Sequence, residues 1–454
     1  MKRLFLLVLL SVALGYPGRG AAQSPWKIGV ARVKITPEKA IWMAGYASRT
    51  KPAEGTLQDL WAKVLAVETA DGGRAVLVTC DLCGICNPLA DEIAGQIQSR
   101  CGLERSRIML TNSHTHSGPV LLGETFDIYP MDAAQPALIA EYTAKLQRQI
   151  VDAVAEACSR LEPAVLWAGE GKADFAVNRR NNKEKTLAET LARGEPLKGP
   201  VDHAVPVLVA REPSGTLRAV AFGYACHNTT LGLQQWCGDY AGFAQADLEK
   251  RFPTALALFH MGCGADQNPL PRRTVDLCQK YGSQLATAVE EVVEHPMRPL
   301  AGRLRTAMTF LDLPYGQQPT AAELKEMANK PGKITYRHRW ARSLLAQLDS
   351  GKPFPKSYPF PVQVWKLGDQ LWVVLGGESV VDYSLLLKKR YGPATWVTSY
   401  ANDVMCYVPS RRVWEEGGYE AGAFEVCGMP ATRWCPDIET RILACVEKLG
   451  GQVR

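Results

Sequence analysis

The chain has 454 residues, of which 46% are hydrophobic and 22% are charged, and its formal net charge is +6. This apolar content is ample for a large core, built as one large domain or two ordinary ones. The near-neutral charge excludes the strongly basic class of nucleic-acid-binding proteins. Beyond the N-terminus no stretch approaches the roughly 18 apolar residues of a transmembrane helix, so we expect no transmembrane segment.

The N-terminus has the pattern of a secretory signal peptide. Met1-Lys2-Arg3 is basic, residues 4–14 are apolar but too short to span a membrane, and Gly20-Ala21-Ala22 offers small residues for cleavage. The sequence therefore predicts a signal peptide at 1–22 and a secreted or periplasmic mature protein. Its net charge is about +3 once the leader is removed.

Thirteen cysteines are an odd number for an exported protein, so at least one is unpaired within the chain. Cys80, Cys83 and Cys86 have the spacing of some iron–sulfur and thiol-redox motifs. A fourth cysteine followed by proline is missing, and export disfavours a cluster, so we expect these residues to pack or to form a structural disulfide. Cys427 and Cys435 lie in a loop rich in glycine and proline, which makes them the best candidates for a disulfide pair.

The first predicted elements are a strand and a hairpin. The apolar alternation changes phase after Val30, which predicts a strand with a bulge before Pro37. Strands at 63–69 and 74–80 bracket Asp71-Gly72-Gly73, a hairpin signal.

A helix comes next and leads into the most informative part of the chain. Asn87 is its expected cap, Pro88 its first residue, and Gly102 ends it before a short buried strand at 107–110. The remaining pattern predicts helices at 136–161, 242–251, 275–294, 320–348 (interrupted at Pro331-Gly332) and 379–391, and strands at 164–170, 207–211, 217–224, 255–260, 304–313, 363–366 and 371–375. Helices that alternate with both hairpins and crossovers predict an α/β fold with a mixed sheet and flanking helices, in a single domain from 25 to 454.

Two of the seven histidines, His114 and His116, follow the strand at 107–110. On extended backbone, side chains two residues apart point to the same face, so both imidazoles can look into one cavity. That spacing suits two ligands of one metal, or one ligand beside a proton-transfer group.

Polar residues follow several other apolar strands: His227, His260 with Asp266, Glu378, and Asn402 with Tyr407. Because ligands bind beyond the carboxyl ends of strands in α/β sheets, these residues could converge on one site. Two neutral imidazoles and a carboxylate form a zinc shell that leaves room for a water and lowers its pKa to roughly 7, which suits attack on an amide or ester carbonyl. The residues alone leave open whether His114 pairs with His116 or with His227.

The stretch Asn112-Ser113-His114-Thr115-His116-Ser117-Gly118-Pro119 resembles the zinc-site signature of the neutral/alkaline non-lysosomal ceramidases. The resemblance covers about residues 28–428, and its other pieces occur in the family order. They include Met43-Ala44-Gly45-Tyr46, Asn178-Arg179, Cys226-His227-Asn228-Thr229, Gly238-Asp239-Tyr240, Gly264-Ala265-Asp266, Gly377-Glu378, and the segment from Tyr400 through Tyr407 to Tyr419-Glu420-Ala421-Gly422.

The resemblance implies a zinc-dependent amidohydrolase that releases a fatty acid and a sphingoid base from ceramide or a related lipid amide. It assigns one Zn²⁺ to His114, His227, Glu378 and Tyr407. It makes His116 a proton-transfer or substrate-binding residue, and Arg179 and Tyr419 the groups that contact the scissile amide and stabilise its oxyanion. It also allows transient contact with a membrane surface.

The chain departs from the family pattern in three places. The C-terminal immunoglobulin-like domain of the family is not expected here, Pro409-Ser410 replaces the usual threonine pair, and Arg180 replaces a serine. The last two changes border the expected pocket, so they could alter specificity while the zinc chemistry is retained.

Three alternatives remain open. The same zinc site could serve another amide or ester, the scaffold could be a non-catalytic binding protein, or Cys226 could act as a nucleophile beside His227. Adjacent residues on a strand face opposite ways, which disfavours the last of these. Among the other histidines we expect His260, with Asp266, to order the site from outside, His203 to be structural or functional, and His295 and His338 to be exposed.

Overall fold

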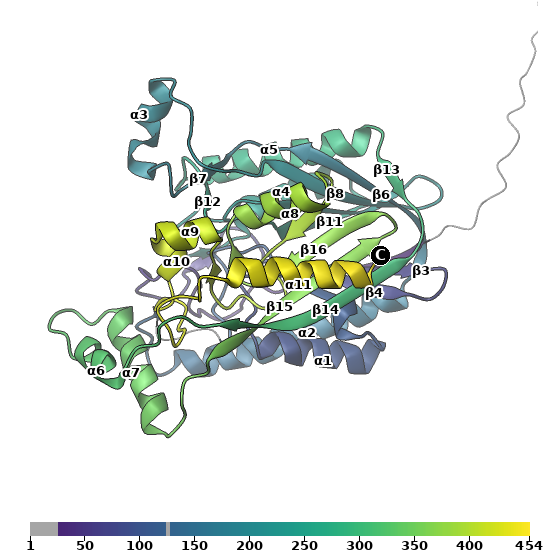
Figure 1. The fold of residues 1–454 in the computed structure, drawn as a ribbon. Coiled ribbons are helices and arrows are strands. Elements are labelled where there is room, and N and C mark those ends of the chain that lie inside the picture. Colours follow the sequence, from purple (N-terminus) through teal and green to yellow (C-terminus); the bar gives the residue numbers. More distant parts are fainter. Residues whose placement is uncertain (1–25, 124–127) are drawn as a thin grey trace, which may run out of the picture.

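The structure is a computed structural model that describes residues 26–123 and 128–454. The predicted signal peptide at 1–22 lies outside these ranges and stays a prediction. Figure 1 shows two stacked sheets with helices on their outer faces, which confirms the predicted mixed α/β fold.

The larger sheet has nine strands within the described ranges: β1 (Trp26–Lys34), β3 (Trp61–Thr69), β4 (Arg74–Cys80), β5 (Ile108–Asn112), β6 (Glu162–Lys172), β8 (Ala204–Arg211), β9 (Leu217–Tyr224), β11 (Leu256–Met261) and β13 (Arg298–Leu300). Their spatial order is β11-β9-β8-β6-β1-β3-β4-β5, with β13 beside β6. The pairs β4/β5 and β9/β11 are parallel and the others are antiparallel. The sheet is therefore mixed, as predicted.

Helices α1 (Leu89–Cys101), α2 (Gln135–Ser159), α4 (Asp239–Arg251) and α5 (Val275–Glu294) cover the outer face of this sheet. On α2 the buried positions recur at helical spacing, as in Leu146, Ile150 and Val154, so one stripe of the helix packs on β1 and β3. The predicted end of α1 is confirmed, because Gly102 takes the left-handed conformation there, with φ 68°.

The smaller sheet has the order β14 (Leu304–Pro314), β15 (Ser357–Leu367), β16 (Gln370–Leu375) and β18 (Trp396–Thr398) within the described ranges. Helices α8 (Asp382–Tyr391) and α11 (Ile438–Gln452) pack on its outer face. Its inner face meets the larger sheet through Trp365, Trp372 and Trp396, which contact residues such as Leu65 and Met109. The result is a four-layer α/β/β/α arrangement with an apolar centre.

Several short elements lie beyond one end of the two sheets, on the left in Figure 1: β7 (Ala176–Asn178), β12 (Gln267–Pro269), α3 (Leu187–Ala192), α6 (Ala321–Ala328), α7 (Tyr336–Asp349), α9 (Arg411–Glu416) and α10 (Tyr419–Gly422). The other short strands are β2 (Gly55–Thr56), β10 (Gln235–Trp236), β17 (Glu378–Ser379) and β19 (Tyr407–Val408). The predicted interruption at Pro331-Gly332 separates α6 from α7, which is confirmed.

The predicted bulge in the first strand is wrong. Strand β1 pairs with β3 in an unbroken register from Trp26↔Thr69 to Lys34↔Trp61. The change of apolar phase arises because both faces of β1 are covered: Ile28 faces the second sheet and Ala31 faces the helices. A strand buried on both faces does not show a simple alternation.

Three smaller predictions also need correction. The residue before α1 is Pro88 and its cap has no side-chain hydrogen bond, so Asn87 is not the cap. His338 is buried rather than exposed, since its Nδ1 accepts from the backbone nitrogen of Thr335, 3.0 Å away, and caps α7. Within the described ranges, which contain all thirteen cysteines, none forms a disulfide, so the predicted Cys427–Cys435 pair is absent. The Cys435 Sγ instead donates to the carbonyl of Tyr315, 3.0 Å away.

Candidate metal centre and active site

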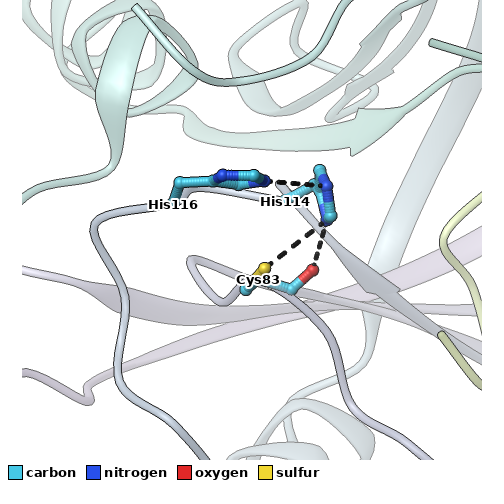
Figure 2. A group of neighbouring side chains, drawn as sticks. All are labelled: Cys83, His114 and His116. Atoms are coloured by element: carbon cyan, nitrogen blue, oxygen red, sulfur yellow. Dashed lines mark hydrogen bonds between the residues drawn. The ribbon is translucent and has the colours of Figure 1, made fainter. Parts of the chain in front are cut away.

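His114 lies just beyond the end of β5, on a sharp turn of the chain. Its φ is 57°, a left-handed conformation that is uncommon for a residue with a side chain. The predicted extended backbone is therefore wrong here, although the predicted convergence with His116 is confirmed: their Nε2 atoms are 3.1 Å apart. Figure 2 shows the His114 ring held from below by Cys83, whose carbonyl oxygen lies 2.6 Å from Nδ1.

His227 follows β9 and is fully buried. Its Nδ1 lies 2.7 Å from the carbonyl oxygen of Gly264, and its backbone nitrogen donates to the carbonyl of Gln267. A carbonyl can only accept, so Nδ1 carries the proton in both His227 and His114. This tautomer leaves a lone pair on Nε2 of each ring, and a metal can bind through that atom.

Glu378 brings a carboxylate to these two lone pairs. Its Oε2 is 3.3 Å from the Nε2 of His114 and 3.3 Å from the Nε2 of His227. Ligand atoms of the three side chains all lie within 4.8 Å of one another, and all three residues are buried. Three acceptors that face one another need a cation between them, and the Oε2 of Glu378 and Nε2 of His227 have no hydrogen-bond partner among the described residues.

Burial and neighbouring groups keep two of these side chains unprotonated. Burial first, then the nearby Arg179, lower the pKa of His227 to about 4. Burial acts to raise the pKa of Glu378, but His114 and His227 outweigh it and hold the pKa well below its usual value. The group therefore presents an ionised carboxylate and an imidazole that resists protonation, and two histidines with one carboxylate fit zinc.

Tyr407 is the fourth residue that the sequence predicts at the metal. Strands β17 and β19 pair in parallel, with Glu378 directly opposite Tyr407. The Tyr407 ring stacks on His227 with centroids 6.4 Å apart. Burial, then the Glu378 carboxylate, raises the pKa of Tyr407 well above its usual value, so its hydroxyl is neutral and can donate.

His116 sits beside the His-His-Glu group and is held on three sides. Tyr46 packs edge-on against its ring, Arg49 Nη2 donates to its carbonyl at 2.6 Å, and Gly45 lies against the ring. Gly45 has φ 92°, and a Cβ there would be 2.3 Å from the Cγ of His116. Burial first, then the imidazoles of His114 and His227, lower the pKa of His116 well below its usual value, so the ring is neutral.

Arg179 reaches the site from the opposite wall. Pairing of β7 with β12 places it near His227, and its Nη2 donates to the hydroxyl of Tyr407 at 3.3 Å. Glu420 fixes the guanidinium by accepting from Nε at 2.8 Å, while the other carboxylate oxygen accepts from Arg180 at 2.6 Å. Arg180 is itself largely buried, with a side chain that is only 10% exposed.

Tyr419 lies at the mouth of the site. Its ring is 5.2 Å from that of Tyr407, and the Arg179 guanidinium lies over both rings. A pocket of about 310 Å³ opens between these tyrosines and His116. Its wall includes the side chains Cys83, Cys86, Ile128, Tyr129, Met405, Val426, Cys427 and Met429.

The remaining predicted residues separate into those near the site and those outside it. Asp266 links the two walls, since Oδ2 accepts from Asn178 and Oδ1 from the backbone of Val381. His260 lies elsewhere, with Nδ1 2.9 Å from the hydroxyl of Thr398 and its ring against Trp372, so it does not order the site. His203 bonds the carbonyl of Ala176 and is structural.

The structure also disfavours Cys226 as a nucleophile. Its thiol is fully buried, and burial raises its pKa well above the usual value. Sequence reasoning missed Glu420, Tyr46 and Cys83 as contacts of the site. The first two lie inside motifs that carry the family resemblance, so their positions beside Tyr419 and Gly45 were the available signal.

Fold and site together define a mixed α/β protein with a buried His-His-Glu group that could hold a metal ion. The chain belongs to the neutral/alkaline non-lysosomal ceramidase family, because the family profile of the N-terminal region matches residues 26–259, just over half of its length. His114, His116, Arg179 and His227 lie inside that match, and Glu378, Tyr407 and Tyr419 lie beyond it.

Two curated neutral ceramidases match part of this chain at low sequence identity. The chain is 27% identical to the neutral ceramidase of Pseudomonas aeruginosa over 233 residues, which are 50% of this chain and 33% of that protein. It is 22% identical to neutral ceramidase B of Dictyostelium discoideum over 247 residues, 51% of this chain and 33% of that protein. The matched region thus spans about a third of the length of these relatives.

Solved structures share the fold over nearly the whole chain. The crystal structure of the Pseudomonas aeruginosa neutral ceramidase superposes with a TM-score of 0.69 at 20% identity, covering 94% of this chain and 75% of that one. A structure described as ceramidase complexed with C2 gives a TM-score of 0.67 at 19% identity, covering 95% and 76%.

Proposed function

We propose that this chain is an exported, zinc-dependent amidohydrolase that cleaves the N-acyl bond of ceramide or a related lipid amide to a fatty acid and a sphingoid base. Membership of the ceramidase family supports the substrate class. The observation that carries the chemistry is the carboxylate of Glu378, 3.3 Å from the Nε2 atoms of both His114 and His227.

One Zn²⁺ per chain would be held by His114, His227 and Glu378, with the Tyr407 hydroxyl oxygen as a fourth ligand. The tautomers support this set, because the carbonyls of Cys83 and Gly264 hold both Nδ1 protons and leave both Nε2 atoms free to coordinate. When bound, such an ion acts as a Lewis acid and makes water nucleophilic near neutral pH.

The protein's own groups would bind, orient and exchange protons. The Arg179 guanidinium and the hydroxyls of Tyr407 and Tyr419 are donors on one wall, where they can orient the amide carbonyl and stabilise charge that develops on its oxygen. His116, neutral and beside the histidine pair, can take a proton at a ring nitrogen and return it to the leaving amine. The apolar and sulfur-containing wall excludes water and accommodates part of an acyl chain.

The test is sphingoid-base release from short-chain ceramide by the purified mature protein, before chelation, after chelation and after zinc is restored. We expect one zinc per chain by elemental analysis and activity that disappears and returns with the metal. His114→Ala and Glu378→Gln should lose activity by at least about 100-fold with the fold retained. The exposed His295→Ala is the matched control, with wild-type activity and metal content.

Full activity in the folded Glu378→Gln variant would overturn the assignment. If the folded, zinc-loaded wild type releases no sphingoid base, ceramide is rejected as substrate. A panel of other N-acyl compounds and esters then identifies the bond that the same site cleaves.

A further inference from the structure

Helices α6 and α7 form a hairpin that projects from the molecule, at the lower left in Figure 1. The segment that joins them, Asn329-Lys330-Pro331-Gly332-Lys333-Ile334-Thr335, is exposed at every residue. Its Ile334 is 54% exposed, although isoleucine is usually buried. We call residues 329–335 the hairpin tip.

The start of α7 ties the hairpin tip to the pocket. Arg339 Nη2 donates to the carbonyl of Ile128 at 2.9 Å, and the indole of Trp340 donates to the carbonyl of Met429 at 3.0 Å. Ile128 and Met429 both line the pocket. The start of α7, which follows the hairpin tip directly, is therefore fixed to two residues of the pocket wall.

Two more large apolar side chains are exposed in the pocket wall or next to it. Tyr419 lines the pocket and is 51% exposed, and Leu122, next to the pocket-lining Gly123, is 48% exposed. A set of exposed apolar residues around a concave site marks a surface that contacts another apolar phase.

The charge at the hairpin tip indicates which kind of apolar partner it would contact. Lys330 and Lys333 both precede Ile334, are exposed, and make no ion pair among the described residues. The next cation along the chain, Arg337 on α7, pairs with Glu425. Long cationic side chains beside an inserted apolar residue suit the boundary of an anionic bilayer, because the stems lie along acyl chains while the charges reach the headgroups.

We propose that the hairpin tip docks the protein onto an anionic lipid bilayer, with Ile334 inserted and with Lys330 and Lys333 at the headgroups, so that the pocket opens at the membrane surface. The proposal rests on the proposed function, since a lipid amide resides in a bilayer. A lysine near an anionic surface changes binding by about fivefold.

The test measures vesicle binding first, so that it does not depend on catalysis. Wild-type protein should sediment with phosphatidylcholine vesicles that contain phosphatidylglycerol and less with phosphatidylcholine alone. The double variant Lys330→Glu/Lys333→Glu should bind the anionic vesicles at least about tenfold more weakly, and Ile334→Ser should weaken binding to both vesicle types. Lys389→Glu/Lys448→Glu makes the same charge change on exposed positions of α8 and α11 and should bind as the wild type does.

The second readout compares substrates. The variants of the hairpin tip should hydrolyse a water-soluble short-chain lipid amide at the wild-type rate. They should hydrolyse a long-chain lipid amide with the same headgroup, embedded in anionic vesicles, more slowly than the wild type does. Unchanged vesicle binding by both hairpin-tip variants, or an equal loss in the control pair, overturns the proposal. Vesicle binding without any amide hydrolysis would reject the proposed function and leave the docking surface standing.

Discussion

Glu378 and Tyr407 lie directly opposite each other in the parallel pairing of β17 and β19, although they are far apart in the sequence. This pairing places the carboxylate and the phenol on one wall, where β9 and β5 deliver His227 and His114 from the larger sheet. The site therefore joins the end of the larger sheet to the separate two-stranded pair of β17 and β19, and a change that loosens either part should alter catalysis.

The first prediction concerns the glycine that supports His116. Gly45→Ala adds a Cβ that would lie 2.3 Å from the Cγ of His116, so the imidazole must move. We expect kcat to fall by roughly 10- to 100-fold with zinc content unchanged, because a displacement of about 1 Å in a proton-transfer group is costly. Steady-state kinetics with elemental analysis provide the measurement.

The matched control is Gly72→Ala in the hairpin between β3 and β4. Gly72 also has a positive φ, of 82°, but a Cβ there meets nothing within 4 Å. This variant should lose about 1 kcal/mol of stability through backbone strain alone and keep its kcat. Equal kinetic effects at Gly45 and Gly72 would refute the role given to Gly45.

The second prediction concerns the buried carboxylate of Glu420, which accepts hydrogen bonds from both Arg179 and Arg180. Glu420→Gln removes the charge and leaves two guanidinium groups near each other, so Arg179 should lose its orientation toward Tyr407. We expect kcat to fall by roughly 10- to 100-fold and unfolding to become easier by about 3 kcal/mol. Kinetics and denaturant titration measure the two effects.

Glu416→Gln gives the comparison for this prediction. Glu416 also pairs with Arg180, but its side chain is 42% exposed. An exposed ion pair contributes about 0–1 kcal/mol, so this variant should stay within about twofold of wild-type activity. A larger kinetic loss in Glu416→Gln than in Glu420→Gln would argue against a special role for Glu420.

The third prediction is a pH dependence of stability that His260 causes. Burial lowers the pKa of His260 to about 3, against 6.5 for the ordinary side chain. The unfolded chain therefore binds a proton that the folded chain refuses, so this contribution is complete above pH 6.5 and is lost as the pH falls toward 3. Between pH 7.5 and 5.5 the loss is about 1.4 kcal/mol.

Denaturant unfolding of zinc-saturated protein at these two pH values measures this effect. His260→Gln cannot titrate, so its stability should fall less over the interval than that of the wild type, whatever its absolute stability. An unchanged slope in His260→Gln would show that His260 takes up a proton as readily in the folded chain as in the unfolded chain.

The fourth prediction uses the thiol in Figure 2. The Cys83 Sγ lies in the pocket wall, 3.8 Å from the Nδ1 of His114. A maleimide attached there would fill the pocket, so alkylation should abolish activity in step with modification of Cys83 as followed by mass spectrometry. Cys83→Ser keeps the backbone carbonyl that orients His114 and should be inactivated much more slowly. Inactivation of Cys83→Ser at the wild-type rate would assign the effect to another thiol.

Local sequence determined the elements of this protein. The glycine after α1, the turn at Asp71-Gly72-Gly73 and the interruption at Pro331-Gly332 act through the backbone of a few neighbouring residues, so their effect is the same in any fold. The apolar period of α2 likewise needs only one covered face. These are the features that were predicted with the correct type and nearly correct bounds.

The residues that form the site could be predicted from the sequence, but their geometry could not. The motif residues His114, His116, Arg179, His227, Glu378, Tyr407 and Tyr419 all come together, as the ordered resemblance implies. The left-handed backbone at His114 was not predicted, because it is imposed by the turn out of β5 and not by the residue itself. The thiol state of Cys427 and Cys435 also depends on which neighbours the fold supplies.

Tertiary structure decided every property that depends on surroundings. The sequence of β1 suggested a bulge because it could not show that helices cover one face and a second sheet covers the other. His338 became a buried cap, and His260 a buried core residue away from the site, because burial and partners come from distant segments. A sequence specifies the donors of a site, but only the packing of remote strands brings their lone pairs close enough to share one cation.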